Sequence, residues 1–436
     1  MGCCHPYYTP THEGDGAFVI DASRIVFGAG CLAEAGDHAR SLGMRRVGIY
    51  TDAGVRRLPY VDIVTRSLAA AGVDFAVFDA VRVEPTDASF GQAARFAAEG
   101  RFDGFVSVGG GSAMDTCKAA NLYSTHPAEF LAYVNAPIGE GRAIPGPLKP
   151  HIACATTCGT GSEVTGVAVF DMVAMRLKTG ISSRLLKPSM ALLDPLVAAS
   201  LPGTVVAASG FDALSHALEA YTALPYTRRA RPANATLRPV YQGANPWSDA
   251  SAVQALEAIG AHLERSVRDA KDAEARTEMM YAGTLAGIAF GGGGCHLPHA
   301  MSYAVAGQVR EYRAPDYPPD RPMVPHGMAV ILNAPSVYRW SAEGCPERHL
   351  HGARCLGADT RGATTADAGE VLARRIIEMM KATLFPSGLG LIGLGEADAN
   401  TLAEGAFAQQ RLLTNSPRPV NKDDLTRLFR GAMQYW

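Results

Sequence analysis

The chain has 436 residues, enough for two domains or for one large domain with a sizeable core. Apolar residues make up 47% and charged residues 19%, a composition typical of a folded globular protein and not of a disordered one. The formal charge of −2 comes from 40 basic and 42 acidic side chains, spread without long blocks of one sign. No basic stripe is interleaved with aromatic residues, so we expect no nucleic-acid partner.

The cysteines and the N-terminus indicate the cellular compartment. Nine cysteines are scattered without a CxxC pair, which predicts free thiols in a reducing compartment. The first 16 residues, MGCCHPYYTPTHEGDG, contain no apolar segment and no arginine-rich amphipathic pattern. No secretory or transit signal is therefore predicted, and we expect a cytoplasmic protein.

Residues 281–309 carry no Asp, Glu, Lys or Arg and are long enough to span a membrane. Four consecutive glycines at 291–294, Pro298 and two histidines interrupt this segment. A buried helix broken by a glycine turn therefore explains it better than a membrane span does.

Strand-like and helix-like segments alternate in the first half of the chain. Short apolar runs rich in β-branched and aromatic residues predict strands, and amphipathic runs between them predict helices. This alternation indicates βαβ units and a parallel sheet. The expected strands cover residues 45–52, 74–81, 102–111 and 151–157, and the expected helices cover residues 60–72 and 87–100.

The second half loses the strand pattern and becomes rich in Ala and Leu with helical spacing. We place the change near Leu201–Pro202, which predicts an α/β domain over residues 1–201 and an all-helical domain over residues 202–436. Two long proline-rich loops, 224–247 and 309–327, interrupt the helical half. Loops of that length inside a compact domain are usually functional or disordered, and we favour function here.

Two polar turns follow successive strands. In VGGGSAMD, residues 108–115, a strand ends in three glycines and a helix begins at Ser112, with Asp115 placed as in a capping box. Glycines let the backbone approach a phosphate, and a helix N-terminus offers free N–H groups. The spacing is not GxGxxG, so a plain strand-to-helix turn is the alternative. A second turn, TTCGTGSEVT at residues 156–165, strengthens the case for a nucleotide site, because ligands of open sheets bind at strand ends.

Five residues are candidate metal ligands for about four positions. Asp212 and His216 are four apart on one helix face, and His296, His299 and His326 follow later in the chain. Carboxylate oxygens and imidazole nitrogens suit zinc or iron(II). An ordinary Asp–His pair on a helix is the alternative for the first two. No cysteine pairs with these residues, so a cysteine-type zinc site is disfavoured.

The segments GGGSAMD, TTCGTGSE and DALSHALEAYT, with a histidine-rich segment ending in PHG, resemble the iron-containing alcohol dehydrogenase family. The resemblance covers nearly the whole chain. It implies an N-terminal Rossmann-like α/β domain that binds NAD(P) and an all-α C-terminal domain, the fold shared with dehydroquinate synthase-like proteins. It also implies one divalent metal, iron or zinc, held by one Asp and three His.

The resemblance can be carried over residue by residue. It assigns no ligand role to His296, which we expect to pack beside the metal site. Many family members have a histidine four residues after the third ligand, proposed to relay a proton; this chain has Tyr303 there. The phenol or a water molecule would then relay the proton. The implied metal ligands are Asp212, His216, His299 and His326.

The resemblance also implies the cofactor contacts. Asp52, at the end of the first predicted strand, would accept ribose hydroxyls and repel a 2′-phosphate, which predicts NAD and not NADP. Lys178 would lie near the ribose. The diphosphate loop and its polar neighbours would be Gly110, Gly111, Ser112, Asp115, Thr156, Thr157, Thr160 and Thr165.

Both long loops exceed those of short-loop family members, and KAANLY, YVNAPIG and MSYAVAG resemble a branch that transfers hydride between a hydroxy acid and an oxo acid. This branch implies oxidation of 4-hydroxybutyrate to succinate semialdehyde, reduction of 2-oxoglutarate to 2-hydroxyglutarate, and a retained NAD. It also implies a mitochondrial location if the chain is eukaryotic. The alternative is an NAD-dependent iron- or zinc-containing alcohol dehydrogenase or aldehyde reductase. A catalytically silent metal- and nucleotide-binding protein is disfavoured by the complete ligand set.

The expected partners are small hydroxy- and oxo-acid substrates and further copies of the chain in a homo-oligomer. Because both substrates carry carboxylates, the site needs cations. We expect at least one loop arginine to bind substrate, although solvated side chains are an equally good interpretation of each one singly. The candidates are Arg228, Arg229, Arg231, Arg238, Arg310 and Arg313.

Overall fold

The computed structural model describes Tyr7, residues 13–21 and residues 23–436. The chain separates into two compact units, Ala22–Leu201 and Met1–Asp21 with Pro202–Trp436. The change of unit at Leu201–Pro202 coincides with the expected boundary. The described residues 13–21, which we assigned to the first domain, group instead with the helical unit. There Asp15 accepts hydrogen bonds from Arg238, and the Val19 N–H donates to Gln242.

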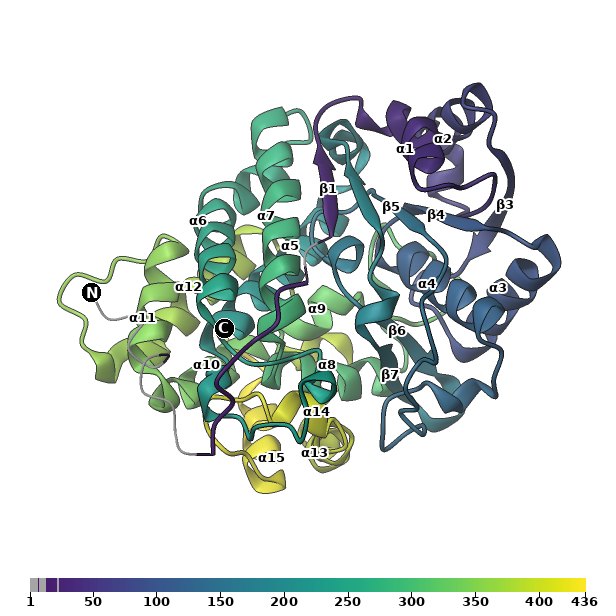
Figure 1. Cartoon of the computed structure of the whole chain (residues 1–436). Coiled ribbons are helices and arrows are strands. Elements are labelled where there is room, and N and C mark those ends of the chain that lie inside the picture. Colours follow the sequence, from purple (N-terminus) through teal and green to yellow (C-terminus); the bar gives the residue numbers. More distant parts are fainter. Residues whose placement is uncertain (1–6, 8–12, 22) are drawn as a thin grey trace. The chain divides into compact units, whose positions relative to one another are not determined.

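A six-stranded sheet forms the centre of the Ala22–Leu201 unit (Figure 1). Every neighbouring pair of strands is parallel, as the alternating pattern predicts. The strand order is β1-β8-β5-β4-β2-β3. The strands are β1 (Arg24–Phe27), β2 (Arg46–Asp52), β3 (Asp74–Val81), β4 (Gly104–Gly109), β5 (His151–Ala155) and β8 (Met190–Leu193).

The order of the strands reverses between β2 and β4. From β2 the chain passes to β3 on one side, and then returns to β4 on the other side. Ligands of open parallel sheets bind beyond the carboxyl ends of the strands at such a reversal. Asp52 ends β2 and Gly109 ends β4, so the predicted cofactor residues flank this point.

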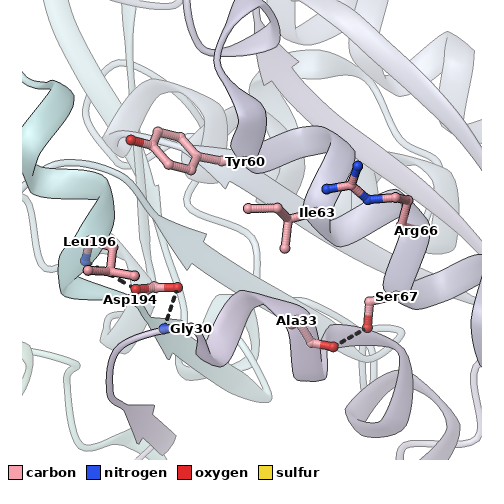
Figure 2. Close-up of a pocket in the computed structure, with 8 residues that line it drawn as sticks. All are labelled: Gly30, Ala33, Tyr60, Ile63, Arg66, Ser67, Asp194 and Leu196. Atoms are coloured by element: carbon pink, nitrogen blue, oxygen red, sulfur yellow. Dashed lines mark hydrogen bonds between the residues drawn. The ribbon is translucent and has the colours of Figure 1, made fainter.

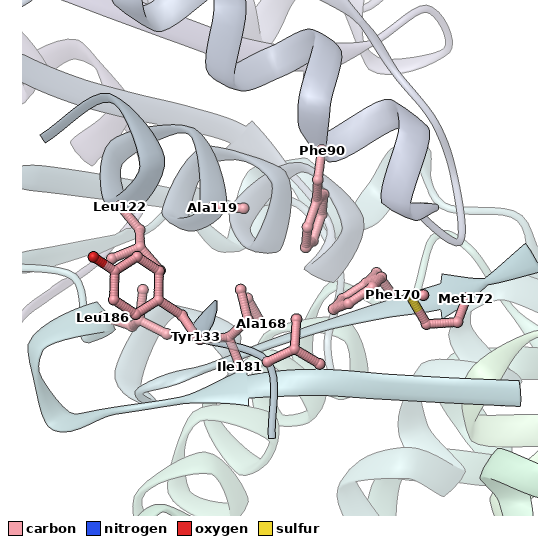
Figure 3. Close-up of a cluster of buried hydrophobic side chains, with 10 residues drawn as sticks. Phe90, Ala119, Leu122, Tyr133, Ala168, Phe170, Met172, Ile181 and Leu186 are labelled. Atoms are coloured by element: carbon pink, nitrogen blue, oxygen red, sulfur yellow. The ribbon is translucent and has the colours of Figure 1, made fainter. Parts of the chain in front are cut away.

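Helices cover the sheet, and α1 packs against α2 while α3 packs against α4 (Figure 1). An antiparallel hairpin, absent from the sequence-based prediction, adds a second core against α3 and α4. Figure 3 shows its Phe170 and Ile181 packed near Phe90 and Leu122. These elements are α1 (Ala35–Ser41), α2 (Pro59–Ala70), α3 (Asp87–Gly100), α4 (Gly111–Thr125), β6 (Val167–Met172) and β7 (Leu177–Ser182).

The other unit is helical in its described residues. Its helix α5 is apolar on nearly all sides and is buried from Val206 to Thr222, where it packs against α6, α7 and α9. The helices are α5 (Gly203–Thr222), α6 (Pro246–Arg268), α7 (Ala273–Gly293), α8 (Leu297–Gln308), α9 (His326–Ile331), α10 (Ala334–Ser341), α11 (Pro346–Cys355), α12 (Ala368–Ala382), α13 (Ala399–Phe407), α14 (Gln410–Leu413) and α15 (Lys422–Gly431).

The uncharged segment 281–309 is two buried helices joined by a turn, as predicted. Helix α7 ends at Gly293 and α8 begins at Leu297. Across the residues with described coordinates, no helix combines the length and apolarity needed to cross a membrane.

Candidate metal and cofactor sites

The four predicted metal ligands converge on one carboxylate oxygen in the helical unit. Asp212 and His216 lie one turn apart on α5, His299 lies in the first turn of α8, and His326 begins α9. The Asp212 Oδ1 atom is 3.8 Å from His216 Nε2, 3.4 Å from His299 Nε2 and 3.8 Å from His326 Nε2. Residues separated by more than 100 positions therefore share one small volume.

These donor atoms fit a metal ion. Asp212 Oδ1 and His299 Nε2 are buried and have no hydrogen-bond partner among the described residues. Buried polar atoms are rarely left in that state unless an ion or water satisfies them. Ligands about 2.1 Å from a tetrahedral ion lie about 3.4 Å apart, close to the observed separations. Their role as ligands stays a prediction.

The site also favours a positive charge. Burial disfavours ionised Asp212, but His216, His326 and His299 outweigh burial and lower its pKa to about 2. Burial lowers the pKa of His216 to about 4. Burial also opposes protonation of His299, yet Cys295 and Glu219 overcome it and hold its pKa well above 6.5. Without a metal, the positive charge beside Asp212 comes from a proton on His299. A divalent cation would supply this charge instead.

Glu219 is a functional candidate that our reading of the sequence missed. It lies seven residues after Asp212 on the same face of α5 and is fully buried. One carboxylate oxygen is 2.5 Å from His299 Nδ1, and the other accepts the backbone N–H of His296. A carboxylate that binds one imidazole nitrogen directs the other toward a metal. The i, i+4, i+7 spacing was the available signal.

His296 and His299 have different environments. The His296 ring caps α8, since its Nδ1 accepts the Leu297 N–H at 2.8 Å, and its Nε2 lies 3.0 Å from the Thr222 hydroxyl. Both ring nitrogens are thus occupied by the fold. The turn before it requires Gly294, whose φ is +89° and whose Cβ would lie 2.7 Å from both Tyr241 and Asn415.

Cys295 corrects an expectation. We expected no cysteine beside the histidines, but the Cys295 thiol lies within 4.8 Å of ligand atoms of His216 and His299. The pairing escaped notice because Cys295 is adjacent in sequence to His296 and not to the ligands. Burial raises the pKa of Cys295 to about 11.

Tyr303, the predicted proton relay, is buried on α8 with its ring centroid 6.1 Å from that of His326. It therefore lies beside the candidate metal site.

Three of the loop arginines donate to protein acceptors. Arg229 donates to Asn415 at 2.6 Å, Arg238 pairs with Asp15, and Arg310 pairs with Asp398. A fourth, Arg313, donates to the Pro319 carbonyl. These contacts favour the structural interpretation of the four side chains.

The two glycine- and threonine-rich turns meet at the sheet edge. A Cβ on Gly110 would lie 2.9 Å from Thr157 Cγ2, and one on Gly111 would lie 2.9 Å from Thr160 Cγ2. The Thr156 N–H donates to the Gly109 carbonyl at 3.0 Å. The glycines thus allow two successive strand ends to approach closely, and α4 begins there without a side-chain cap.

Asp52 lies at the same edge. One carboxylate oxygen accepts the N–H groups of Gly54 and Val55, and the other lies 3.6 Å from the position of a Cβ on Gly109. It therefore stands beside the glycine turn, as the predicted ribose contact requires.

Asp115 does not form the predicted capping box, because α4 is capped by Gly110 and has no side-chain cap. Its carboxylate instead accepts the Ser162 hydroxyl at 2.5 Å and the Val169 N–H at 2.9 Å. Lys118, fully buried, lies 3.6 Å from it. Asp115 therefore links α4 by hydrogen bonds to the turn at residues 156–165 and to strand β6 of the hairpin.

Other predicted cofactor residues also have local partners. Lys178 lies 2.7 Å from both Glu84 and Asp171, and burial opposes its charge less than these carboxylates favour it, so its pKa is raised. The Ser112 hydroxyl accepts the Glu84 N–H at 3.1 Å. Thr165 is buried after the short turn Ser162–Val164. These residues thus have structural roles at the carboxyl edge of the sheet.

A surface pocket of the same unit lies between α2, the short turn Cys31–Glu34 that precedes α1, and the segment that follows β8 (Figure 2). Its polar groups have local partners: Asp194 accepts the N–H groups of Gly30 and Leu196, and Ser67 donates to the Ala33 carbonyl. It contains none of the predicted site residues and carries no functional assignment.

Comparison with known proteins agrees with this arrangement. The family model for iron-containing alcohol dehydrogenase matches residues 22–195, and the model for the C-terminal domain of that family matches residues 239–433. The chain is 49% identical to hydroxyacid-oxoacid transhydrogenase of Bos taurus and 47% identical to that of Homo sapiens, each over 97% of this chain and 91% of the relative. An alcohol dehydrogenase structure from Oenococcus oeni is 28% identical, with a TM-score of 0.83 over 95% of this chain and 100% of that one. The chain belongs to the iron-containing alcohol dehydrogenase family.

Proposed function

We propose that this enzyme transfers hydride from 4-hydroxybutyrate to 2-oxoglutarate, giving succinate semialdehyde and 2-hydroxyglutarate. The observation that carries the proposal is the 49% identity over 97% of the chain to a hydroxyacid-oxoacid transhydrogenase. The reaction balances, because the hydride and proton lost by the alcohol are those gained by the oxo acid. The oxidoreductase class follows from the family itself.

Family membership implies a divalent metal and a nicotinamide, and we propose that NAD stays bound between the two half-reactions. Bound metal would polarise the alcohol or carbonyl oxygen, and nicotinamide would carry the hydride. Asp212, His216, His299 and His326 would hold the metal, while Asp52 and the turn at Gly110 would hold the nucleotide. Iron fits the family's description, and the same donor atoms accept zinc.

The protein's own groups would then orient the reactants and move one proton. Glu219 fixes the direction of the His299 ring through its Nδ1 atom. Tyr303 would hold or pass the proton. It stands four residues after His299, where many family members have a histidine, and its phenol can donate and accept a proton. Asp52 would favour NAD through the ribose hydroxyls.

The test is a coupled assay with purified, metal-loaded protein, 4-hydroxybutyrate and 2-oxoglutarate, without added nicotinamide. Formation of succinate semialdehyde and 2-hydroxyglutarate in equal amounts supports the proposal. If neither product forms until NAD is added, and NADH then accumulates without 2-oxoglutarate, the enzyme is instead an NAD-dependent alcohol dehydrogenase. That alternative is favoured by the likeness to the Oenococcus oeni alcohol dehydrogenase.

The relatives from Bos taurus and Homo sapiens are described as mitochondrial. We propose the same location if this chain is eukaryotic, and the cytoplasm if it is bacterial. The homo-oligomer stays a prediction that analytical ultracentrifugation tests.

A further inference from the structure

A substrate carboxylate needs a cation close to the metal site, and this requirement rests on the proposed function. Three of the six candidate loop arginines supply it poorly. Arg229, Arg238 and Arg310 already donate to Asn415, Asp15 and Asp398. Binding a substrate through them would break an existing hydrogen bond or ion pair.

Arg411 differs from these arginines. It lies on the short helix α14, and its side chain is only partly exposed. Its Nη1 atom is buried and has no hydrogen-bond partner among the described residues. A buried guanidinium N–H without an acceptor is costly, so an oxygen acceptor at this position would be stabilising.

The surroundings of Arg411 lead to the candidate metal site. Its guanidinium carbon lies 4.7 Å from the ring centroid of Tyr241, on the long loop 224–247. It interacts electrostatically with Tyr303, the predicted proton relay, and with Cys295, which lies beside His216 and His299.

Aromatic side chains connect Tyr241, which contacts Arg411, to His216 of the candidate metal site. Tyr241 contacts Phe290 with ring centroids 6.3 Å apart, and Phe290 stacks on His216 at 3.9 Å. A cation whose Nη1 atom lacks a hydrogen-bond partner among the described residues thus lies against Tyr241 and near Tyr303. Tyr241 positions the guanidinium by a cation–π contact and a side-chain hydrogen bond, while the Nη1 atom is left without an acceptor among the described residues.

We propose that Arg411 binds the substrate carboxylate, and that Tyr241 holds its guanidinium in place. The ligand class is a short-chain carboxylic acid with an alcohol or carbonyl group. Arg411 would determine specificity, because a neutral alcohol of the same length has no group to satisfy the buried Nη1. The extra loop 224–247 would contribute through Tyr241.

The experiment measures binding of succinate, an unreactive carboxylate probe, to the metal-loaded enzyme by calorimetry. Loss of one charge-assisted hydrogen bond predicts that Arg411→Gln weakens binding by about 10- to 100-fold. Arg411→Lys keeps the charge but loses the planar fork, so it should bind with intermediate affinity. Arg310→Ala is the matched control, since Arg310 is exposed and paired with Asp398, and its affinity should match wild type.

Catalysis gives the second measurement. With added NAD, the ratio of KM for 4-hydroxybutyrate to KM for 1-butanol should rise about tenfold or more in Arg411→Gln. A purely structural loss would change both substrates alike. Melting temperature and metal content close to wild type show that the variants are folded. If Arg411→Gln binds succinate within twofold of wild type, the proposal is wrong.

The two proposals fail in different ways. Wild type that forms no 2-hydroxyglutarate from 2-oxoglutarate contradicts the transhydrogenase reaction, while succinate affinity that depends on Arg411 still supports the carboxylate site. Wild type that performs the reaction, with Arg411→Gln unchanged in succinate affinity, contradicts Arg411 alone. Wild type that binds no succinate at all also overturns the Arg411 assignment.

Discussion

The two candidate sites differ in how their polar groups are satisfied. At the sheet edge, Asp115 accepts hydrogen bonds from Ser162 and Val169, and Lys178 forms ion pairs with Glu84 and Asp171. The groups left to contact a ligand there are the close-packed glycine and threonine turns. In the helical unit, Asp212 Oδ1 and His299 Nε2 are buried and have no hydrogen-bond partner among the described residues. Among the predicted cofactor residues that the structure describes, only Thr157 has a buried side-chain atom without a hydrogen-bond partner. A site made largely from backbone can therefore be nearly complete before its ligand arrives, whereas a metal site keeps donor atoms unsatisfied until the ion binds.

Removing a donor should have the largest effect. We expect His299→Ala to lose bound metal and at least about 1,000-fold in activity, because the ring lies 3.4 Å from Asp212 and faces the shared volume. His296→Ala is the control and should retain the metal, since that ring only caps α8 and contacts Thr222. Elemental analysis of both variants measures this. Retention by His299→Ala with loss by His296→Ala would reverse the assignment.

Removing Asp115 should damage the fold of the other unit. Asp115→Ala leaves Lys118 buried without its carboxylate, which should reduce the free energy of unfolding by about 3–5 kcal/mol. The double variant Asp115→Asn with Lys118→Met removes both charges and should be more stable than the single variant. Urea denaturation measures both. Equal stability of Asp115→Ala and wild type would show that the pair contributes nothing.

Changing Glu219 should weaken metal binding without abolishing it. Glu219→Gln keeps an acceptor for His299 Nδ1 but removes the negative charge, so we expect metal affinity to fall by about 10- to 100-fold. Chelator competition measures the affinity, and the visible spectrum of the cobalt-substituted enzyme reports the ligand geometry. An unchanged affinity together with an unchanged spectrum would assign Glu219 to the fold alone.

The smallest effect concerns pH. Burial lowers the pKa of His151 on β5 to about 3, whereas the unfolded value is about 6.5. Below pH 6.5 His151 therefore binds a proton in the unfolded chain but stays neutral in the folded chain. The free energy of unfolding consequently falls as the pH falls. Between pH 6.5 and pH 5 this residue should account for about 2 kcal/mol. His151→Gln should reduce that pH dependence in urea titrations; an identical dependence would contradict the assignment.

The sequence alone determined the local features. Short apolar runs rich in β-branched and aromatic residues predicted β2, β3, β4 and β5, and β2, β4 and β5 are apolar along their length because both of their faces are buried. The spacing of Asp212 and His216 placed both on one face of a helix, although the prediction missed Glu219 on the same face. The resemblance to the family then supplied the two remaining predicted ligands. Each of these inferences depends on neighbours within about ten residues.

Only the tertiary structure decided which distant groups meet. The hairpin of β6 and β7 was missed because its short strands are stabilised by packing on α3 and α4, a contact that no local pattern reveals. Burial and pairing turned Asp115 inward, brought Cys295 beside His216, and left Arg411 with an unused N–H beside Tyr241. Whether a polar side chain is occupied or available depends on what the fold places against it, and sequence spacing does not contain that information.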